Sequence, residues 1–583
     1  MTISSLLESK LRTALDGAEA KVSAATDTRF GDYQTNVAMI LAKQQRANPR
    51  QVAQTIIEKL DLADMCESPE IAGAGFINFR LKPAWLAQRF AELCADARLG
   101  VPSPAQPRKI VIDFSSPNVA KPMHVGHIRS TILGESLARI AEFIGHETVR
   151  DNHIGDWGKQ FGMLLVGWKM RVAETGVAPE SIEQLEQIYK GMNARIAAEG
   201  DGEKPVSAQI SDELVKLQNG DEENLALWRE MIRISQKEFD SIYTRLAVRF
   251  DVTLGESFYN PQLKGIVQEL VARGLAAESD GALCVFSDGA VKPEDDPLLI
   301  KDKDGWRANP ALVQKSDGTA NYTTTDLATL QYRLATWSPD EIIYITDGRQ
   351  QLHFRQFFAI YRRWHSEITT KLAHVWFGSI LGDDGKPFKT RSGDTIRLTD
   401  LLNEAEQRAL KLVVEKNPDL PDAERREIAR IVGIGAVKYA DLLPNRQSDY
   451  TFSWDKMLSF QGNTAPYLQY SYVRIRSIFR KLGSEFQFSA FNFQLFDPAE
   501  LALAKKLLQF GEVLPQVLDD YRPNVLANYL YELASTFHSF FEACPVLKSE
   551  DPTRTSRLAL CDTTARLLKQ GLALLGIEVP ERM

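Results

Sequence analysis

The hydrophobic positions that follow residue 108 predict a strand, a helix and a second strand in succession. Residues 109–114 (KIVIDF) form a short apolar run that is typical of a buried parallel strand. From residue 128 onward the apolar side chains recur at a helical spacing, and Gly145 can end that helix. Residues 147–156 return to a strand pattern and close on a glycine turn. This strand–helix–strand unit is typical of the start of a doubly wound parallel sheet.

The strand pattern returns much later in the chain, at residues 340–347 and 373–381. The residues at about 172–249 are polar, charge-rich and helical in their spacing, so they do not continue the sheet. We therefore expect an α/β domain whose parallel sheet is built in two halves, with a helical insertion at about 172–249 between them.

The two ends of the chain follow other patterns. Residues 1–106 begin with an amphipathic helix and include a strand-like run at 76–81, which predicts a small α/β domain. Three prolines within residues 101–107 predict a stiff linker after it. From about residue 421 the pattern consists of long amphipathic helices. The expected domains are therefore 1–106, 107–420 and 421–583 of a chain of 583 residues.

Composition and charge narrow the class of protein. Hydrophobic residues make up 44% and charged residues 25% of the chain, which excludes disordered and fibrous classes. The net charge of −8 means that any binding of nucleic acid must use a local basic surface. The five cysteines form no CxxC pair, so neither a disulfide framework nor a structural metal site is expected. With no apolar run long enough to span a membrane and no signal peptide, the sequence favours a cytoplasmic protein.

The clearest chemical feature is His124-Val125-Gly126-His127, which lies where a loop gives way to the predicted helix. A helix start offers free N–H groups and the positive end of the helix dipole, both suited to phosphate. Lys121, just upstream, adds a cation, and the group suits transfer of a nucleotidyl group. The alternative is a capped helix with two incidental histidines.

Two other segments are basic. Residues 381–396 bring Lys386, Lys389 and Arg391 into a glycine-rich stretch that could reach a triphosphate, although a solvated basic turn has the same composition. Residues 467–481 interleave tyrosines with arginines, a combination that stacks bases and holds phosphates. The alternative there is an amphipathic helix with a packed aromatic side.

Taken together, these segments resemble the class I aminoacyl-tRNA synthetases, and specifically the arginyl-tRNA synthetases. The segment PNVAKPMHVGH, from Pro117 to His127, is similar to the family's extended HIGH motif, and residues 386–393 (KPFKTRSG) resemble a degenerate KMSKS loop. Further segments resemble regions particular to the arginyl family: GDYQTN (31–36), NYTTTD (321–326), GRQQLHFRQFF (348–358), NTAPYLQYSYVRIRSI (463–478) and LGIEVPERM (575–583).

The resemblance implies a Rossmann-type catalytic domain, an N-terminal domain that contacts tRNA and an all-α anticodon-binding domain. It implies ligation of L-arginine to tRNA(Arg) through arginyl-adenylate. ATP, with Mg²⁺ bound to it, and no structural metal would be needed, and the enzyme would be a monomer without membrane attachment. Two alternatives remain open: an HxGH nucleotidyltransferase that acts on a small metabolite, and a non-catalytic paralogue that binds RNA.

The resemblance also implies roles for individual residues. The catalytic residues would be Lys121, His124, His127 and Lys389. Those that bind ATP would be His124, Gly126, His127, Lys386, Lys389 and Arg391. Those that bind arginine would be Asp113, Asn118, His124, Tyr322, Asp326 and Gln350. Those that bind tRNA would be Tyr33, Asn36, Tyr467, Arg474 and Arg476.

The sequence departs from the family pattern in two places. Asp113 stands where relatives often have a glutamate, and Thr390 stands where the second lysine of the basic loop would be. Lys121 is the nearest cation that could replace that lysine.

Overall fold

A five-stranded parallel sheet forms the centre of the computed structural model, which describes residues 1–25, 27–199, 205–388, 395–483 and 493–583. The strands, in their order across the sheet, are β14 (Lys371–His374), β13 (Glu341–Tyr344), β5 (Lys109–Asp113), β6 (Glu147–Ile154) and β7 (Val252–Gly255). The predicted strands 109–114 and 147–156 are thus neighbours, and the Rossmann-type sheet is confirmed.

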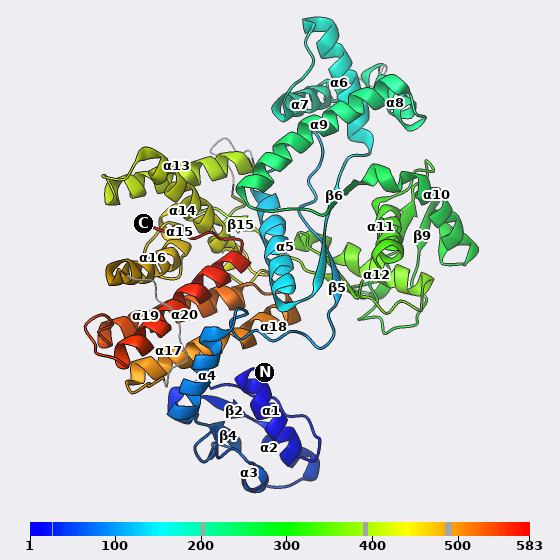
Figure 1. The fold of residues 1–583 in the computed structure, drawn as a ribbon. Coiled ribbons are helices and arrows are strands. Elements are labelled where there is room, and N and C mark those ends of the chain that lie inside the picture. Colours follow the sequence, from blue (N-terminus) through cyan, green and yellow to red (C-terminus); the bar gives the residue numbers. More distant parts are fainter. Residues whose placement is uncertain (26, 200–204, 389–394, 484–492) are drawn as a thin grey trace. The chain divides into compact units, whose positions relative to one another are not determined.

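Helix α5 (Val125–Ile144) connects β5 to β6 and packs on both strands (Figure 1). Its apolar residues are buried, as the helical spacing predicted. The helix ends at Gly145, whose φ of 118° lies in the left-handed region that glycine adopts without steric cost. After β5 the chain forms β6 and β7 on one side of β5, and later forms β13 and β14 on the other side. The direction of winding therefore reverses between β5 and β13, which is where open α/β sheets bind ligands.

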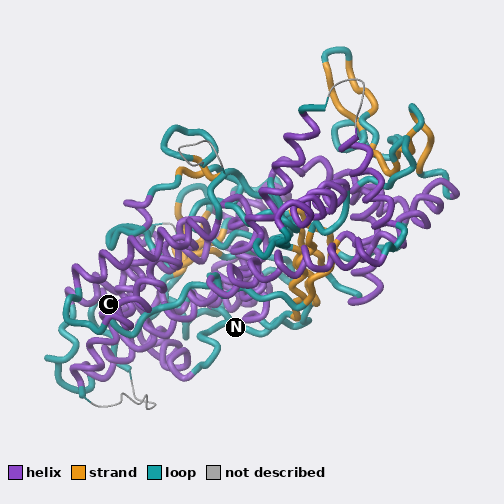
Figure 2. Tube along the Cα trace, turned by 90° about the horizontal axis from the view of Figure 1, so that it is seen from above, coloured by secondary structure: helices purple, strands orange, loops and turns teal. Residues whose placement is uncertain are grey.

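Helices α11 (Tyr322–Trp337) and α12 (Gln351–Trp364) cover one face of this sheet. Their buried side chains, among them Leu327 and Phe357, form one core with Val111 and Ile342 of the strands. Figure 2 shows the strands lying among the helices.

Between β6 and β13 the chain contains two segments outside the parallel sheet, one before β7 and one after it. The first is helical and consists of α6 (Lys159–Thr175), α7 (Ile182–Ala197), α8 (Pro205–Gln218) and α9 (Glu222–Arg245). It has its own small apolar core, formed by Val166, Met192 and Ile210. The second follows β7 and consists of α10 (Glu256–Ala272) and the antiparallel strands β8 (Ala276–Ser279), β9 (Ala282–Val285), β10 (Leu299–Asp302), β11 (Gly305–Ala308) and β12 (Ala311–Gln314). The hydrophobic pattern did not reveal these short strands.

The chain divides into two units, of which the sheet belongs to the one that contains residues 106–408 and 444–454. This unit also holds the short parallel pair β15 (Ile380–Leu381) and β16 (Tyr450–Thr451). The other unit combines residues 1–105, 409–443 and 455–583. The division 1–106, 107–420 and 421–583 remains a prediction.

The second unit joins a small α/β region to a helical region. The α/β region contains α1 (Ile3–Ala14), β1 (Ser23–Ala24), β2 (Tyr33–Thr35), α2 (Val37–Gln45), α3 (Pro49–Lys59), β3 (Glu70–Ala72), β4 (Phe76–Phe79) and α4 (Pro83–Ala95). The helical region contains α14 (Asp422–Leu442), α15 (Trp454–Met457), α16 (Ala465–Leu482), α17 (Pro498–Leu508), α18 (Phe510–Asp520), α19 (Asn524–Ala543) and α20 (Thr553–Leu574), while α13 (Leu398–Lys416) precedes them. Across the described stretches, no helix combines the length and the apolar character needed to cross a bilayer.

Candidate active site

The two histidines of the HxGH motif form the cap of helix α5. His124 is the N-cap residue, and its Nδ1 accepts a hydrogen bond of 3.1 Å from the backbone N–H of Gly126. Nδ1 of His127 accepts one of 3.1 Å from the backbone N–H of His124, and the two ring centroids lie 4.0 Å apart. Since both Nδ1 atoms are acceptors, each neutral ring carries its proton on Nε2. The cap therefore leaves an N–H donor on each imidazole for a ligand.

Burial decides the charge of these rings. Burial, with a smaller contribution from the neighbouring His124, lowers the pKa of His127 to about 3. Burial also lowers the pKa of His124, as does the guanidinium of Arg349. Both histidines are consequently neutral at pH 7. The positive charge of the predicted group therefore comes from Lys121, and the two rings can contribute N–H donors.

Gly126 has a steric role within the motif. A Cβ atom at this position would lie 2.9 Å from Cε1 of His124, so glycine leaves room for the ring that caps the helix. The close approach that requires glycine is thus to a side chain of the motif itself, while the backbone at Gly126 remains exposed.

The segment that resembles the HIGH motif begins with a residue that faces the protein interior. Pro117, its first residue, is buried, and its carbonyl accepts a hydrogen bond of 3.0 Å from the backbone N–H of Gly155, which follows β6. The backbone N–H of Val119 donates back to the carbonyl of Gly155 at 3.0 Å. Pro117 therefore fixes the start of the motif to the sheet, whereas the donors available to a ligand lie at the other end, on His124 and His127.

The segment that follows the basic loop lies against the start of α5. The backbone N–H of Val125 donates to the carbonyl of Ile396 at 2.9 Å, and that of Leu398 donates to Met123 at 2.9 Å. Lys386, on the other side of the loop, is exposed. The predicted ATP contacts Lys389 and Arg391, like Thr390, lie outside the described residues.

Asp113 has an internal partner that the sequence analysis did not anticipate. Its Oδ2 accepts a hydrogen bond of 2.8 Å from Arg333, and its Oδ1 accepts one of 3.1 Å from Ser116. The Arg333 side chain is completely buried and also binds Asp151 at 2.8 Å. Asp113 therefore neutralises a guanidinium of the protein. A contact of this carboxylate with an arginine ligand remains a prediction.

Asp326 lies one helical turn after Tyr322 on α11, as expected. Its Oδ2 is 2.5 Å from Nε2 of His353, and the ring of Tyr322 lies 4.8 Å from that of His353. Among the residues that the structure describes, only His353 bonds this half-buried carboxylate. Tyr322 is 62% exposed. The three side chains form an anionic and aromatic group beside the sheet.

Two more carboxylates belong to this region of the site, and sequence reasoning missed both. Glu256 begins α10 directly after β7, and Asp156 follows β6. Burial raises the pKa of Glu256 to about 7, and the charges of Asp156 and Asp326 contribute to the rise. Asp156 accepts hydrogen bonds from the backbone and the hydroxyl of Ser257. The available signal was that each residue lies within two positions of the end of a strand of the sheet.

Asn118 lies in the loop after β5, and Gln350 ends a short 3-10 helix, η2 (Gly348–Gln350), between β13 and α12. The exposed Asn118 pairs with Gly155 in an isolated bridge, and a Cβ at Gly155 would lie 2.4 Å from Oδ1 of Asn118. Gln350 is exposed at the start of α12. The adjacent Arg349 is ion-paired with Asp347 at 2.8 Å. Since Arg349 also affects the pKa of His124, the loop after β13 brings an additional cation close to the start of α5.

The residues expected to bind tRNA lie in the second unit, and their exposure differs. Tyr33 is 1% exposed, and its hydroxyl donates to Glu512 at 3.2 Å. It is a core residue, so the expectation that it contacts tRNA is wrong. Asn36 is exposed at the start of α2.

The remaining three residues expected to bind tRNA lie on α16. Tyr467 is half-buried. The guanidinium carbon of Arg474 lies 4.6 Å from the ring centroid of Phe541, and that of Arg476 lies 5.8 Å from the ring of Phe479. These two guanidinium groups of α16 thus lie against phenylalanine rings, one on α19 and one on α16 itself, and not against the interleaved tyrosines.

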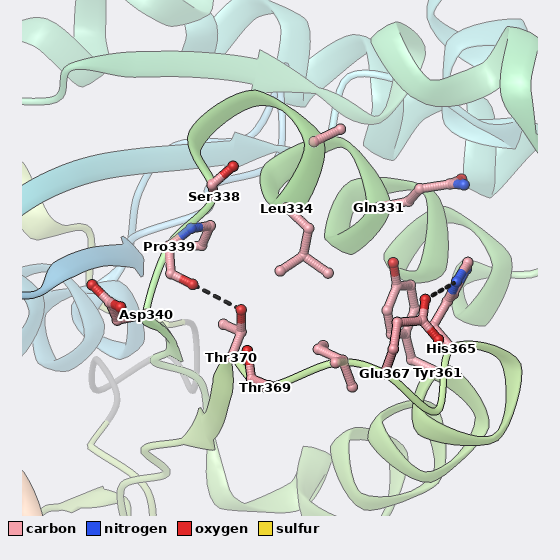
Figure 3. Close-up of a pocket in the computed structure, with 12 residues that line it drawn as sticks. Gln331, Leu334, Ser338, Pro339, Asp340, Tyr361, His365, Glu367, Thr369 and Thr370 are labelled. Carbon is pink, nitrogen blue, oxygen red and sulfur yellow. Dashed lines mark hydrogen bonds and ion pairs between the residues drawn. The ribbon is translucent and has the colours of Figure 1, made fainter.

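An open cavity of about 710 Å³ lies beside the amino ends of β13 and β14 (Figure 3). Its residues include Asp340 and Thr370, which directly precede β13 and β14, and a group formed by Tyr361, His365 and Glu367. Ligands of open α/β sheets bind at the carboxyl ends of the strands, and this cavity lies at the amino ends. It is separate from the site at the start of α5.

Comparisons with known proteins agree in all parts of the chain. A family model described as "tRNA synthetases class I (R), catalytic domain" matches residues 91–454. "Arginyl tRNA synthetase N terminal domain" matches residues 1–81, and "DALR anticodon binding domain" matches residues 468–583. The chain is 48% identical to the arginine–tRNA ligase of Laribacter hongkongensis and 46% identical to that of Chromobacterium violaceum, over the whole of each protein.

Solved structures are similar over the same extent. The arginyl-tRNA synthetase of Plasmodium falciparum is 29% identical with a TM-score of 0.82, and the alignment covers 100% of this chain and 99% of that one. The arginyl-tRNA synthetase of Thermus thermophilus is 26% identical with a TM-score of 0.82, and both chains are covered completely.

Proposed function

The chain belongs to the arginyl-tRNA synthetase family and is an arginine–tRNA ligase, and from this premise we propose how its residues divide the work. The ligase joins L-arginine and ATP to form arginyl-adenylate and pyrophosphate, and then transfers the arginyl group to the 3′ end of tRNA. The observation that supports our assignment most directly is the pair of neutral histidines with their Nε2 donors at the start of α5.

ATP binds at the start of α5, with its phosphates toward His124 and His127. During adenylate formation a carboxylate oxygen of arginine attacks the α-phosphorus, and negative charge grows on the phosphate oxygens. The preorganised Nε2–H groups and the helix dipole stabilise that charge. Because both histidines are neutral, the formal positive charge comes from Lys121 and from the basic loop with Lys386, Lys389 and Arg391. Arg349 adds another cation close by.

Magnesium arrives on the triphosphate of ATP. In the described portion of the chain, no group of three or more histidine, cysteine, aspartate or glutamate side chains could hold a metal ion.

Arginine binds with its guanidinium toward Asp326, on the side of the site that also holds Glu256 and Asp156. A carboxylate can accept two parallel N–H bonds from a planar guanidinium. Tyr322, Asn118 and Gln350 line the remainder of the arginine pocket. Asp113 supports this pocket indirectly, because it fixes the buried Arg333 between β5 and β6.

The tRNA partner is tRNA(Arg), and we assign its contacts in the second unit to Asn36, Tyr467, Arg474 and Arg476. We also propose that the ligase acts as a monomer in the cytoplasm.

The decisive experiment is arginine-dependent exchange of pyrophosphate into ATP, measured with and without tRNA(Arg), followed by charging of tRNA with labelled arginine. A ligase supports both reactions with arginine only. A nucleotidyltransferase of small metabolites would ignore tRNA, and a non-catalytic RNA-binding paralogue would show no exchange.

A further inference from the structure

Helix α7 of the helical insertion contacts two segments that flank the start of α5. Glu183, Glu186 and Tyr189 are spaced three residues apart, so they lie along one side of the helix. Tyr189 contacts Lys121, which precedes the HxGH motif. The two glutamates contact Arg397, which follows the basic loop. One side of a helix in the helical insertion thus reaches both margins of the proposed ATP site.

The contact with Lys121 is a cation–π interaction. Nζ of Lys121 lies 4.8 Å from the centroid of the half-buried Tyr189 ring. An aromatic face attracts an ammonium group without neutralising it and without accepting its N–H bonds in the way a carboxylate does. Lys121 can therefore be held in place while it keeps its charge and donors for a phosphate. The loop itself is fixed nearby, because the backbone N–H of Ala120 donates to Ser235 of α9 at 2.9 Å.

The contact with Arg397 fixes the position of α7. Nη2 of Arg397 lies 2.8 Å from Oε2 of Glu186, and Nη1 lies 3.7 Å from Oε1 of Glu183. The Arg397 backbone forms an antiparallel bridge with His124. Lys190 binds the other oxygen of Glu186 at 2.8 Å. The ion pair therefore ties α7 to the strand-like segment that lies on the HxGH helix.

We propose that Tyr189 is a positioning residue for Lys121 in adenylate formation, and that the Glu186–Arg397 ion pair holds α7 where Tyr189 can act. This inference rests on the proposed role of Lys121 at the phosphates. A lysine that is already in place does not have to reorient as charge develops on the phosphate, so the free-energy barrier is lower than with an unrestrained lysine side chain. The effect should therefore appear in kcat of activation more than in KM for ATP.

The test replaces Tyr189 in two ways and measures arginine-dependent ATP–pyrophosphate exchange. Tyr189→Leu removes the aromatic face but keeps an apolar side chain with good helix propensity. It should lower kcat about 3- to 10-fold, with KM for ATP changed less than about twofold. Tyr189→Phe keeps the ring and should restore nearly all of the loss. Equal effects of the two variants would show that the aromatic face is irrelevant and would overturn the proposal.

A double-mutant cycle with Lys121→Ala separates this inference from the proposed role of Lys121. Lys121→Ala alone should lower kcat, and Tyr189→Leu should cause no further loss in that background. If Lys121→Ala leaves kcat unchanged, the role of Lys121 at the phosphates is wrong. If Lys121→Ala lowers kcat but Tyr189→Leu has no effect, only the positioning role of Tyr189 is wrong. The same conclusion holds if Tyr189→Leu lowers kcat by the same factor with and without Lys121.

The ion pair is tested with Glu186→Gln, which should lower kcat about 3-fold or more in the wild-type background and have no effect in the Lys121→Ala background. The matched control is Glu230→Gln, because Glu230 forms an ion pair with Arg233 within α9 and does not bridge to Arg397. Circular dichroism verifies that both variants are folded. Equal losses in the two variants, or a loss from Glu186→Gln that persists without Lys121, would show that the pair only stabilises the insertion.

Discussion

At the scale of single residues, hydrogen bonds decide what the HxGH histidines can do. Each ring uses Nδ1 to cap the helix, which fixes its tautomer and leaves Nε2–H for a ligand. Because burial lowers the pKa of His127 to about 3, the ring remains a neutral donor throughout the physiological pH range. This residue therefore stabilises phosphate by directional hydrogen bonding and not by a formal charge.

His127→Ala should lower the rate of adenylate formation by about 10²-fold or more, which is the effect of losing one preorganised donor to a transition state. The measurement is ATP–pyrophosphate exchange by purified, folded protein. His146→Ala is the control, since His146 lies beyond the opposite end of the same helix and accepts a hydrogen bond from Arg108. Near-wild-type exchange by the His127 variant would remove this residue from the site.

Asp326→Ala should raise the KM for arginine at least about 30-fold, because the guanidinium loses its carboxylate partner in a partly desolvated site. Asp326→Asn should be nearly as harmful, and KM for ATP should change little in either variant. Asp317→Asn, in an exposed turn of the same unit, is the control. Since Asp113 is paired with Arg333, unchanged arginine KM values would place guanidinium recognition at Glu256 and Asp156 instead.

Arginine binding should depend on pH through Glu256. In the free enzyme burial raises the pKa of this carboxyl to about 7, so about half of the molecules are protonated there at pH 7. A bound guanidinium favours the ionised form, so binding releases a proton and the affinity increases as pH rises. The Kd for arginine should fall several-fold, up to about tenfold, between pH 6 and pH 8. Calorimetric titration would measure it, and a slope that persists in Glu256→Gln would rule out this carboxyl as its source.

At the scale of elements, α17 and α18 pack against the N-terminal α/β region within one unit. Lys505 of α17 binds Asp32 at 2.6 Å. Glu512 of α18 accepts hydrogen bonds from the backbone of Ser4 and from the hydroxyl of Tyr33. Two regions from opposite ends of the chain are therefore joined by specific polar contacts as well as by a shared apolar surface.

Tyr33→Phe tests the role of Tyr33 in this contact. It removes one hydrogen bond and leaves part of the half-buried Glu512 carboxyl unpaired, so it should lower the free energy of unfolding by about 1–2 kcal/mol. Urea denaturation would measure the change, with Tyr470→Phe on the exposed side of α16 as the control. The KM for tRNA of the folded variant should be unchanged. A raised KM for tRNA with unchanged stability would restore Tyr33 as a tRNA contact.

At the scale of the whole molecule, the residues proposed for adenylation and those proposed for tRNA binding belong to different units. Asp326 and His127 lie in the unit with the parallel sheet, whereas Arg474 and Arg476 lie in the helical unit. A tRNA that contacts both units can couple them, because it stabilises whichever conformation binds it best.

We therefore expect tRNA(Arg) to stimulate the exchange reaction. The segments that carry Tyr322, Gln350 and Asn118 come from separate loops and helices, so a ligand can shift the population toward an assembled pocket. Exchange should be measured with enzyme freed of tRNA, then with added tRNA(Arg) whose terminal ribose has been oxidised to prevent charging. A tRNA of another specificity serves as the control. Full exchange activity without any tRNA would contradict this expectation.

The sequence by itself determined the family and several local elements of the parallel sheet, though not the short strands after β7. The apolar run at β5, the helical spacing of α5 and the stop at Gly145 depend on neighbours within a few residues, so each could be predicted without the fold. The same holds for the turn of helix that brings Tyr322 and Asp326 to one side of α11. The HxGH motif and the basic loop identified the chemistry because their residues are close in sequence.

Only the tertiary structure decided which charged side chains from separate elements contact each other and which side chains are buried. Arg333 reaches Asp113 across 220 positions of the chain, and Glu512 reaches Tyr33 across 479, so neither pairing has a local signal. The neutral state of His127 also depends on the side chains that exclude water around it. Spacing in the sequence predicts contacts along one element, whereas partners contributed by separate elements, and the pKa shifts that burial causes, are set only when the chain has folded.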